Sequence, residues 1–278
     1  MRILVICDGS PRAVQAAGFL RMLRYNSGTQ VILLAVGQVT RSRASLQAHL
    51  TQIKAALGGI YPDIRELVSP GRLMDQVKIE ANETNYDLVV VGDQPVTGTL
   101  KRLSRARMVA KLAHRLWKPL LIVRGLPDHL ERVLICTSAE PAADLTLEMS
   151  AKLLASQHLK EVRLLHVMSQ VALSVKSPGG DLVASAESAI DSGTREGQHF
   201  VSAMERLRKA GLKATIKPRL RHGLVLDEVR AEVRHQESEL LVIGSHHRAG
   251  RSRLIEYLLE DVAQDLLQEV PCSVLVIG

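Results

Sequence analysis

The chain repeats itself, and this duplication limits its possible folds more than any other feature of the sequence. Four segments of the first half recur in the same order in the second half. They are Arg2–Pro11 with Arg132–Pro141, Gly71–Val77 with Gly223–Val229, Asp87–Gly92 with Glu239–Gly244, and Lys118–Val123 with Cys272–Ile277. Self-similarity on this scale predicts two copies of one domain in tandem.

The 278 residues suffice for two domains of ordinary size, about 100 to 150 residues each. Turn-forming residues at Gly125–Asp128 separate the two copies, so we predict domains over residues 1–126 and 127–278. Copy two is longer than copy one. Its extra residues lie around Val171–Phe200, where Ser177–Gly180 indicates a loop and a helical pattern then continues through Leu207.

Apolar runs of strand length alternate with amphipathic helices in copy one. The run Val31–Val36 is apolar throughout, as is typical of strands buried on both faces of a parallel sheet. The expected helices are Ala13–Leu23, Leu46–Leu57, Leu73–Ala81 and Val109–Leu116. With right-handed crossovers, this order predicts an α/β fold of two tandem doubly wound, Rossmann-like domains with five parallel strands each.

No apolar run approaches the roughly 20 residues that cross a bilayer, and the apolar stretch within Met1–Asp8 is too short for a secretory signal. We therefore expect a cytoplasmic protein with no membrane partner. The cysteines Cys7, Cys136 and Cys272 are odd in number and lie in strand-like runs without metal-binding spacing. We expect them to be buried thiols, neither disulfide partners nor metal ligands.

The formal net charge of +7 and the pI near 9.5 favour an anionic partner such as a nucleotide or nucleic acid. A basic, solvated surface without a specific partner also explains the charge, and it is the more common case. Aromatic residues make up only 3% of the chain, which argues against a stacking platform for single-stranded nucleic acid.

Ligands of open parallel sheets bind beyond the carboxyl ends of the strands, where the strand order reverses. The motifs expected there are Asp8–Ser10, Leu165–Val167, Gly71 and Gly223, Gly244–His246, and the closing run Pro271–Val276. In this order and spacing they resemble the universal stress protein family over nearly the whole chain, twice. The resemblance implies that the fused copies form in one chain the pair that members form by dimerising, a pseudo-dimer.

The resemblance also implies a phosphate-binding loop, and copy one departs from it. ATP-binding members carry Gly-x-x-Gly and then, about nine residues on, Gly-Ser or Gly-Thr, whose backbone N–H groups and hydroxyl hold phosphates. Here Gly92 is followed by Asp93, Gln94 and Pro95, and proline has no N–H. The Gly-Ser position falls at Ala106–Arg107, where a side chain occupies the phosphate seat.

Copy two departs further from the family pattern. His247 stands in place of the second glycine, Glu260–Asp261 falls at the Gly-Ser position, and Thr137 stands where the family has an aspartate. Two carboxylates facing a triphosphate repel it by several kcal/mol at an effective dielectric constant of about 20. We therefore expect copy two to be a structural partner that does not bind ATP in the family's manner.

Copy one keeps a candidate site for ATP, AMP or another anion. Its expected residues are Asp8, at the position of the family's adenine-contacting aspartate, with Val36, Gly92, Gly98 and Arg107. The basic residues Lys101, Arg102 and Arg105 lie nearby and offer phosphate-binding donors. The default expectation is nevertheless that no cofactor is bound.

Several of these features also have purely structural interpretations. The basic run 101–107 is more typical of a solvated helix start, as is the cluster Arg248, Arg251 and Arg253. His246–His247 suits a loop, His166 suits a structural role, and neither Ser10 nor Ser138 lies in a nucleophile elbow. Asp8 also suits the N-cap of the helix that follows it.

The leading hypothesis is a tandem universal stress protein that acts as a non-enzymatic binding or regulatory module in the stress response. An ATP- or AMP-binding protein that hydrolyses slowly through copy one is the first alternative, so weak ATPase activity stays open. A basic protein associated with nucleic acid is the second, less favoured alternative. The protein partner, and whether two tandem chains pair into a homodimer, are not determined by the sequence.

Overall fold

The computed structural model describes residues 1–37, 43–93, 109, 111–113, 116, 118–138, 143–169, 185–244, 265–267 and 269–278. Its contacts divide the chain into two compact units, described separately below. Unit 1 comprises Met1–His129 with Pro271–Val276 and Gly278, and unit 2 comprises Leu130–Val270 with Ile277. The division falls close to the turn at Gly125–Asp128, while the domain limits 1–126 and 127–278 stay a prediction.

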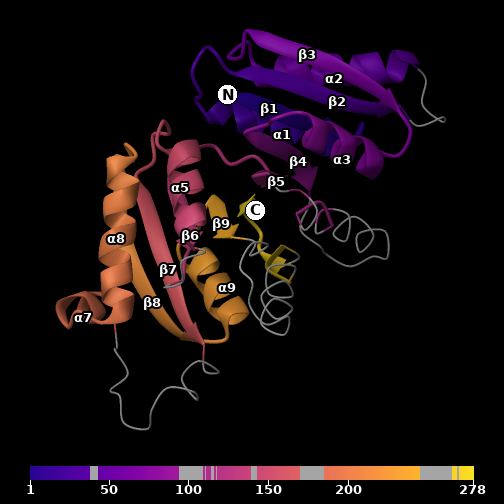
Figure 1. Ribbon diagram of the computed structural model, residues 1–278. Coiled ribbons are helices and arrows are strands. Elements are labelled where there is room, and N and C mark those ends of the chain that lie inside the picture. Colours follow the sequence, from indigo (N-terminus) through magenta and orange to yellow (C-terminus); the bar gives the residue numbers. More distant parts are fainter. Residues whose placement is uncertain are drawn as a thin grey trace. The chain divides into compact units, whose positions relative to one another are not determined.

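Unit 1 is a mostly parallel sheet with helices on both faces (Figure 1). Its strands lie in the order β3-β2-β1-β4-β5-β10. They are β1 Arg2–Cys7, β2 Gln30–Gly37, β3 Asp63–Pro70, β4 Leu88–Asp93, β5 Leu120–Arg124 and β10 Ser273–Ile277. Strands β1 to β5 pair in parallel, whereas β10, from the end of the chain, pairs antiparallel with β5.

Burial along the strands follows their place in this sheet. Every residue of β4 and β5 is buried, as are all residues of β1 after Arg2. Strand β3, at the end of the order, alternates between half-buried and exposed residues. The fully apolar runs of the sequence are therefore central strands covered on both faces, as expected for a parallel sheet.

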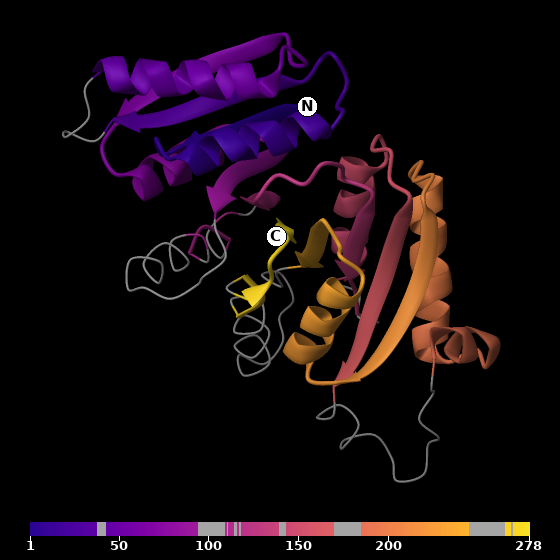
Figure 2. The same ribbon diagram turned by 180° about the vertical axis from the view of Figure 1, so that it is seen from behind.

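The helices of unit 1 are α1 Pro11–Met22, α2 Arg43–Leu57 and α3 Leu73–Glu83. Helices α1 and α2 pack against each other on one face of the sheet, as Figure 2 shows. Pro11 begins α1, where its missing N–H costs no hydrogen bond. Three predicted helices are thus confirmed to within a turn, and the fourth is helical at the described residues 109 and 111–113.

Unit 2 repeats this architecture, with strand order β9-β6-β7-β8. The strands are β6 Arg132–Cys136, β7 Glu161–Ser169, β8 Thr215–Gly223 and β9 Leu240–Gly244, all paired in parallel. In sequence order this is the arrangement β4-β1-β2-β3 of unit 1. The α/β fold class and the tandem repeat predicted from the sequence are confirmed.

The helices of unit 2 are α5 Ala143–Leu154, α7 Ala186–Asp191, α8 Arg195–Lys209 and α9 Val225–His235. Helices α5 and α8 pack on one face of the sheet, and α9 packs against β7 and β8 on the other (Figures 1 and 2). Helix α8 has the same length as α2 and the corresponding place in the order. The short helix α7 is therefore the described part of the extra segment of copy two.

None of the helices among the described residues is both long and apolar enough to span a membrane.

Candidate functional site

Three predicted site residues of unit 1 lie at the same edge of its sheet. Asp8 follows β1, Val36 is near the end of β2, and Gly92 is near the end of β4. Because β1 lies between β2 and β4 and all three are parallel, their carboxyl ends meet where the strand order reverses. Gly98 and Arg107, with the whole basic run 101–107, lie outside the described residues.

Asp8 is half-buried and forms a local turn with Ser10. Its Oδ1 accepts hydrogen bonds from the backbone N–H of Ser10 at 3.0 Å and from the hydroxyl of Ser10 at 2.6 Å. This is the short-range turn that aspartate favours. The N-cap of α1 is Ser10, so the interpretation of Asp8 as the N-cap is wrong. Asp8 instead accepts hydrogen bonds from the N-cap residue.

Gly92 is required by packing at this edge. A Cβ atom at this position would overlap the backbone carbonyl of Arg12 in the first turn of α1. Gly244, its counterpart at the end of β9, is similar, because a Cβ there would overlap Oγ1 of Thr146 in α5. Both glycines thus have a structural explanation that involves no bound phosphate.

A buried ion pair follows Gly92 directly. The guanidinium of Arg124, at the end of β5, lies 3.1 Å from Oδ2 of Asp93, and the two side chains are 0% and 2% exposed. The backbone N–H of Arg124 donates to the hydroxyl of Ser273 in β10 at 3.1 Å. Sequence reasoning missed this pair, although an aspartate behind the glycine and an arginine ending an apolar strand were both visible.

The strand registers correct one detail of the repeat. Ile3 pairs with Leu88 in unit 1, and Val133 pairs with Leu240 in unit 2. Counting along β1 and β6 from these pairs, Cys7 corresponds to Thr137 and Asp8 corresponds to Ser138. The assignment of Thr137 as the counterpart of Asp8 is therefore wrong by one residue, which in a strand turns the side chain to the other face.

Thr137 is instead the centre of a histidine cluster in unit 2. Its hydroxyl is hydrogen-bonded to Nε2 of His199 on α8 at 2.9 Å, and its carbonyl accepts from Nδ1 of His166 on β7 at 3.2 Å. The edge of Phe200 lies against the ring of His166. His199 was not singled out from the sequence, because it lies 62 residues from its partner in an ordinary amphipathic helix.

The physical environment lowers the pKa of both histidines. For His166 the main cause is desolvation by burial, which the backbone carbonyl of Thr137 only partly offsets. For His199 the main cause is again burial, followed by the charge that His166 would carry. Both imidazoles are therefore held neutral to a lower pH than free histidine.

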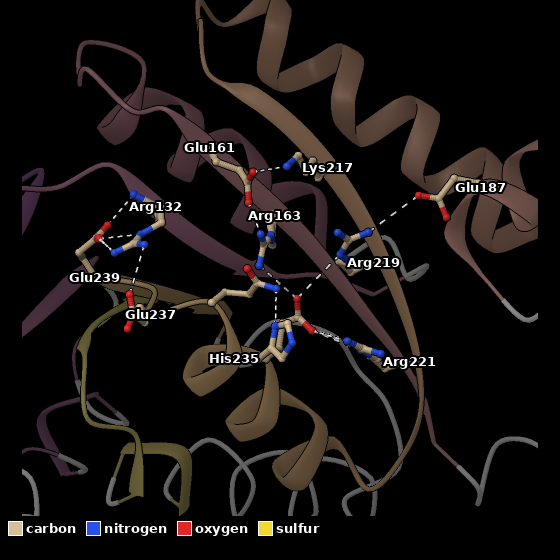
Figure 3. A network of polar contacts seen from close by, with 12 residues as sticks. Arg132, Glu161, Arg163, Glu187, Lys217, Arg219, Arg221, His235, Glu237 and Glu239 are labelled. Carbon is tan, nitrogen blue, oxygen red and sulfur yellow. Dashed lines mark hydrogen bonds and ion pairs between the residues drawn. The ribbon is translucent and has the colours of Figure 1, made fainter.

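A charged network lies on the opposite face of this sheet, between β7, β8 and α9. Arg163, Arg219 and Arg221 point toward one carboxylate, that of Glu232, as the dashed lines in Figure 3 show. Glu232 is 1% exposed, and its shortest ion pair, to Arg221, measures 2.8 Å. Because cations and carboxylates of the chain neutralise one another here, the network is best explained as a structural element.

Glu161 extends the network along β7. It lies 2.5 Å from Arg163 and 2.5 Å from Lys217 of β8. Burial acts to raise the pKa of Glu161, but the hydrogen bond from Lys217 and the charges of both cations outweigh it. Its pKa therefore lies below the ordinary value, and Glu161 is ionised at neutral pH.

The cysteines and metal-binding residues offer no second site in the described chain. None of the three cysteines forms a disulfide, but only Cys7 is buried; Cys136 and Cys272 are half-buried, which corrects the expectation for those two. Burial raises the pKa of the Cys7 thiol, so it is not a reactive thiolate. Within the described ranges, no three His, Cys, Asp or Glu side chains are placed to hold a metal ion.

Residues 129–278, more than half of the chain, match the sequence model of the universal stress protein family. The chain belongs to this family. The resemblance drawn from the motifs is thereby confirmed, and the match falls on copy two. No protein of curated function shows significant sequence similarity to this universal stress protein.

Solved structures are similar to the universal stress protein over its whole length. A universal stress protein from Archaeoglobus fulgidus matches with a TM-score of 0.62 and 13% identity, covering 99% of this chain and 95% of the other. A functionally unknown protein from Pseudomonas aeruginosa PAO1 matches with a TM-score of 0.60 and 14% identity, covering 99% and 92%. At such identities the likeness shows the fold alone, here the tandem fold.

The cytoplasmic domain of a prokaryotic cation chloride cotransporter also matches, with a TM-score of 0.53 and 11% identity, covering 99% of this chain and 94% of the other. The tandem fold is therefore shared by proteins with different roles. Function must be argued from the residues at the strand ends.

Proposed function

We propose that this universal stress protein is a non-catalytic binding or regulatory module in which neither unit holds ATP in the manner of the ATP-binding members. The observation that carries the proposal is the buried pair of Asp93 and Arg124 directly behind Gly92. A carboxylate of the chain itself neutralises the buried cation at the end of β5. Arg124 is therefore committed within the fold, and a phosphate would have to compete with Asp93 for it.

Unit 2 supports the same conclusion by a different route. At the end of β6 the chain has Thr137 and Ser138 where unit 1 has Cys7 and Asp8, so the carboxylate of the candidate adenine contact is missing. The hydroxyl of Thr137 is already hydrogen-bonded to His199. We therefore infer that unit 2 serves as the structural partner of unit 1.

The fusion of the two copies is part of this proposal. We infer that it replaces dimerisation, because one chain already contains both members of the pair. The antiparallel pairing of β10, from the end of copy two, with β5 supports this inference. The proposal places the protein in the cytoplasm with a protein partner that recognises the paired form.

The best-supported alternative is that unit 1 binds ATP or AMP and hydrolyses it slowly. It is favoured by the gathering of Asp8, Val36 and Gly92 at one edge of the sheet, where nucleotides bind in open α/β folds. In that case the carboxylate of Asp8 would contact the adenine, and arginines of unit 1 would replace the missing glycine N–H groups.

Thermal unfolding with millimolar ATP or AMP separates the two hypotheses. A ligand present at about a hundred times its Kd stabilises a protein by about 2.7 kcal/mol, which is a shift of several degrees. We expect no such shift. A shift in the wild-type protein that disappears in Asp8→Asn would contradict the proposal and establish the alternative.

The matched control for this experiment is Asp128→Asn. Asp128 is exposed in the turn between the units, and the substitution changes the net charge as Asp8→Asn does. The asparagine in Asp8→Asn can still accept the hydrogen bonds from Ser10, so the fold of the turn is retained. A nucleotide-induced shift that both variants lose alike would indicate non-specific charge effects.

A further inference from the structure

In unit 2, the hydrogen bonds of two histidines connect β6, β7 and α8 at one point. The backbone carbonyl of Thr137, directly after β6, accepts a hydrogen bond from His166 of β7, and the hydroxyl of Thr137 is hydrogen-bonded to His199 of α8. The two imidazole rings are 6.3 Å apart between centroids. The ring of Phe200 lies 6.4 Å from that of His166 and 6.2 Å from that of His199, so an apolar side chain packs against both.

Unit 1 lacks the centre of this cluster. The strand registers place Cys7 and Ala35 opposite Thr137 and His166. Along the helices, the buried residues Leu50, Ile53 and Leu57 of α2 match Phe200, Ala203 and Leu207 of α8, which places His49 opposite His199. The repeat therefore folds without the contacts that Thr137 makes with histidines in unit 2. The cluster also acts on α8, the helix that directly follows the extra segment of copy two.

Charged groups surround the two histidines on every element packed against them. Helix α8 supplies Arg195, Glu196 and Arg206, α5 supplies Asp144, and β8 supplies His222. The charge of Asp144 is partly engaged already, because Arg206 lies 3.2 Å from its carboxylate. Glu148 of α5 lies 3.6 Å from Arg206 as well. The acidic groups therefore do not compensate for two imidazolium ions.

We propose that Thr137, His166 and His199 form a pH-sensitive clasp that fastens α8 to the end of the sheet of unit 2 and releases it in mild acid. In the neutral state each ring makes its hydrogen bond to Thr137 and packs against Phe200. When both rings gain protons, two like charges 6.3 Å apart are held in a largely desolvated cluster. Mutual repulsion and the need for hydration then favour opening of α8.

The sign of the effect follows from the direction of the pKa shifts. Both histidines have a lowered pKa in the folded protein relative to the ordinary value of 6.5. The open state therefore binds more protons than the closed state in mild acid. The contribution of the clasp is complete above the ordinary pKa and is lost progressively as the pH falls below it toward the folded pKa values.

Hydrogen exchange along α8 tests the clasp in the full chain. After correction for the intrinsic exchange rate, we expect the protection of α8 amides to fall about tenfold between about pH 7.5 and pH 5.5, since pH 5.5 lies about one unit below the ordinary histidine pKa of the open state and each unit of pH below it corresponds to a factor of ten. Helix α1 of unit 1, which contains no histidine, is the internal reference and should keep its protection. Equal protection of α8 at both pH values would overturn the proposal.

Variants distinguish the clasp from a general effect of acid. The double variant His166→Gln/His199→Gln keeps an amide that can bond to Thr137 but cannot gain a proton, so the pH dependence of α8 should disappear. The control is His158→Gln, an exposed histidine of the same unit, which should leave the dependence unchanged. Persistence of the pH dependence in the double variant would overturn the proposal.

A measurement on the wild-type protein keeps the proposal testable should the double variant fail to fold. NMR titration of the imidazole resonances should show His166 and His199 titrating below the ordinary histidine pKa of 6.5, together with the loss of α8 protection. Titration of both rings at or above that ordinary value would overturn the proposal.

Discussion

Units 1 and 2 build the same layer, between the sheet and the helix after its third strand, from opposite chemistry. In unit 1, β2 places Ile32 there, 5% exposed. In unit 2 the corresponding residue of β7 is Arg163, 9% exposed, which shares the carboxylate of Glu232 with two further arginines. Glu80, the counterpart of Glu232 on α3, instead accepts a hydrogen bond from Tyr86 at 2.5 Å.

This difference shows that the fold requires side chains that fill the space between sheet and helix at this position, whether those side chains are apolar or charged. An isoleucine fills it by burying apolar area. Arginine fills it with its aliphatic stem and needs a buried anion for its head group. Arg163 pairs with Glu161 at 2.5 Å, and Glu232 is the further anion that it shares with Arg219 and Arg221; without Glu232 these cations would be incompletely neutralised, which is costly where they are buried. The two units should therefore respond very differently to the loss of equivalent carboxylates.

The largest effect is expected for Glu232→Ala. It removes the anion that three arginines share, and we expect the free energy of unfolding to fall by about 3 kcal/mol, the lower end of the range for a broken buried pair, because Arg163 keeps Glu161 and because Arg219 and Arg221 are 34% and 46% exposed. Glu80→Ala, the same change at the matching position of unit 1, removes hydrogen bonds at a half-buried site and should cost about 1 kcal/mol. Urea denaturation measures both.

Equal losses in the two variants would contradict the distinction between the units. The comparison is sharpened by Arg163→Leu/Glu232→Leu, which gives unit 2 the apolar layer of unit 1. This double variant should recover most of the stability that Glu232→Ala loses, because replacing a buried ion pair with packed apolar side chains is often neutral.

A smaller difference is expected between the two strand-end glycines. In Gly92→Ala the new methyl group meets the backbone of Arg12, which cannot rotate away, and we expect a loss of about 2–3 kcal/mol. In Gly244→Ala it meets the side chain of Thr146, whose rotation should limit the loss to about 1 kcal/mol. Thermal unfolding of both variants measures which of the two substitutions costs more stability.

The second glycine allows a double-mutant test. Thr146→Ala removes the atom that the new methyl group would overlap, so Thr146→Ala/Gly244→Ala should be more stable than the sum of its single changes predicts. Strict additivity would show that Thr146 is not the obstacle, and a smaller loss for Gly92→Ala than for Gly244→Ala would reverse the comparison.

The smallest effect is expected for a partly exposed ion pair of unit 1. Lys54 of α2 lies 2.5 Å from Glu66 of β3, with side chains 44% and 24% exposed. Lys54→Met should change the free energy of unfolding by about 0.5 kcal/mol or less, since solvent and salt screen such pairs. A loss of stability comparable to that of Glu232→Ala would show that solvent exposure does not explain the difference in stability contribution between exposed and buried ion pairs.

Much of the fold could be predicted because it is encoded locally. The run Leu88–Val91 has no polar face, so it has to be a central strand, and each strand is followed by a helix pattern of sufficient length to cross the sheet. Asp8 and Gly92 were found for the same reason, since residues that end parallel strands meet at one edge. Their role in binding a ligand stays a prediction.

The polar contacts could not be predicted in this way. His199 and Thr137 are 62 residues apart, and Asp93 and Arg124 are 31 residues apart. Whether such groups meet depends on how far each strand extends and which way each helix is rotated. The one-residue error at Thr137 has a different origin, because the pairing of Arg2–Pro11 with Arg132–Pro141 already places Asp8 opposite Ser138.

The sequence by itself determined the duplication, the alternation of strand and helix, and the family to which the chain belongs, because hydrophobic period and turn residues act within a few neighbours along the chain. Only the tertiary structure decided which charges are paired, that Glu232 is buried among arginines while Glu80 is not, and that α8 is joined to β6 through histidines. Those outcomes depend on burial, and burial is a property of the assembled layers.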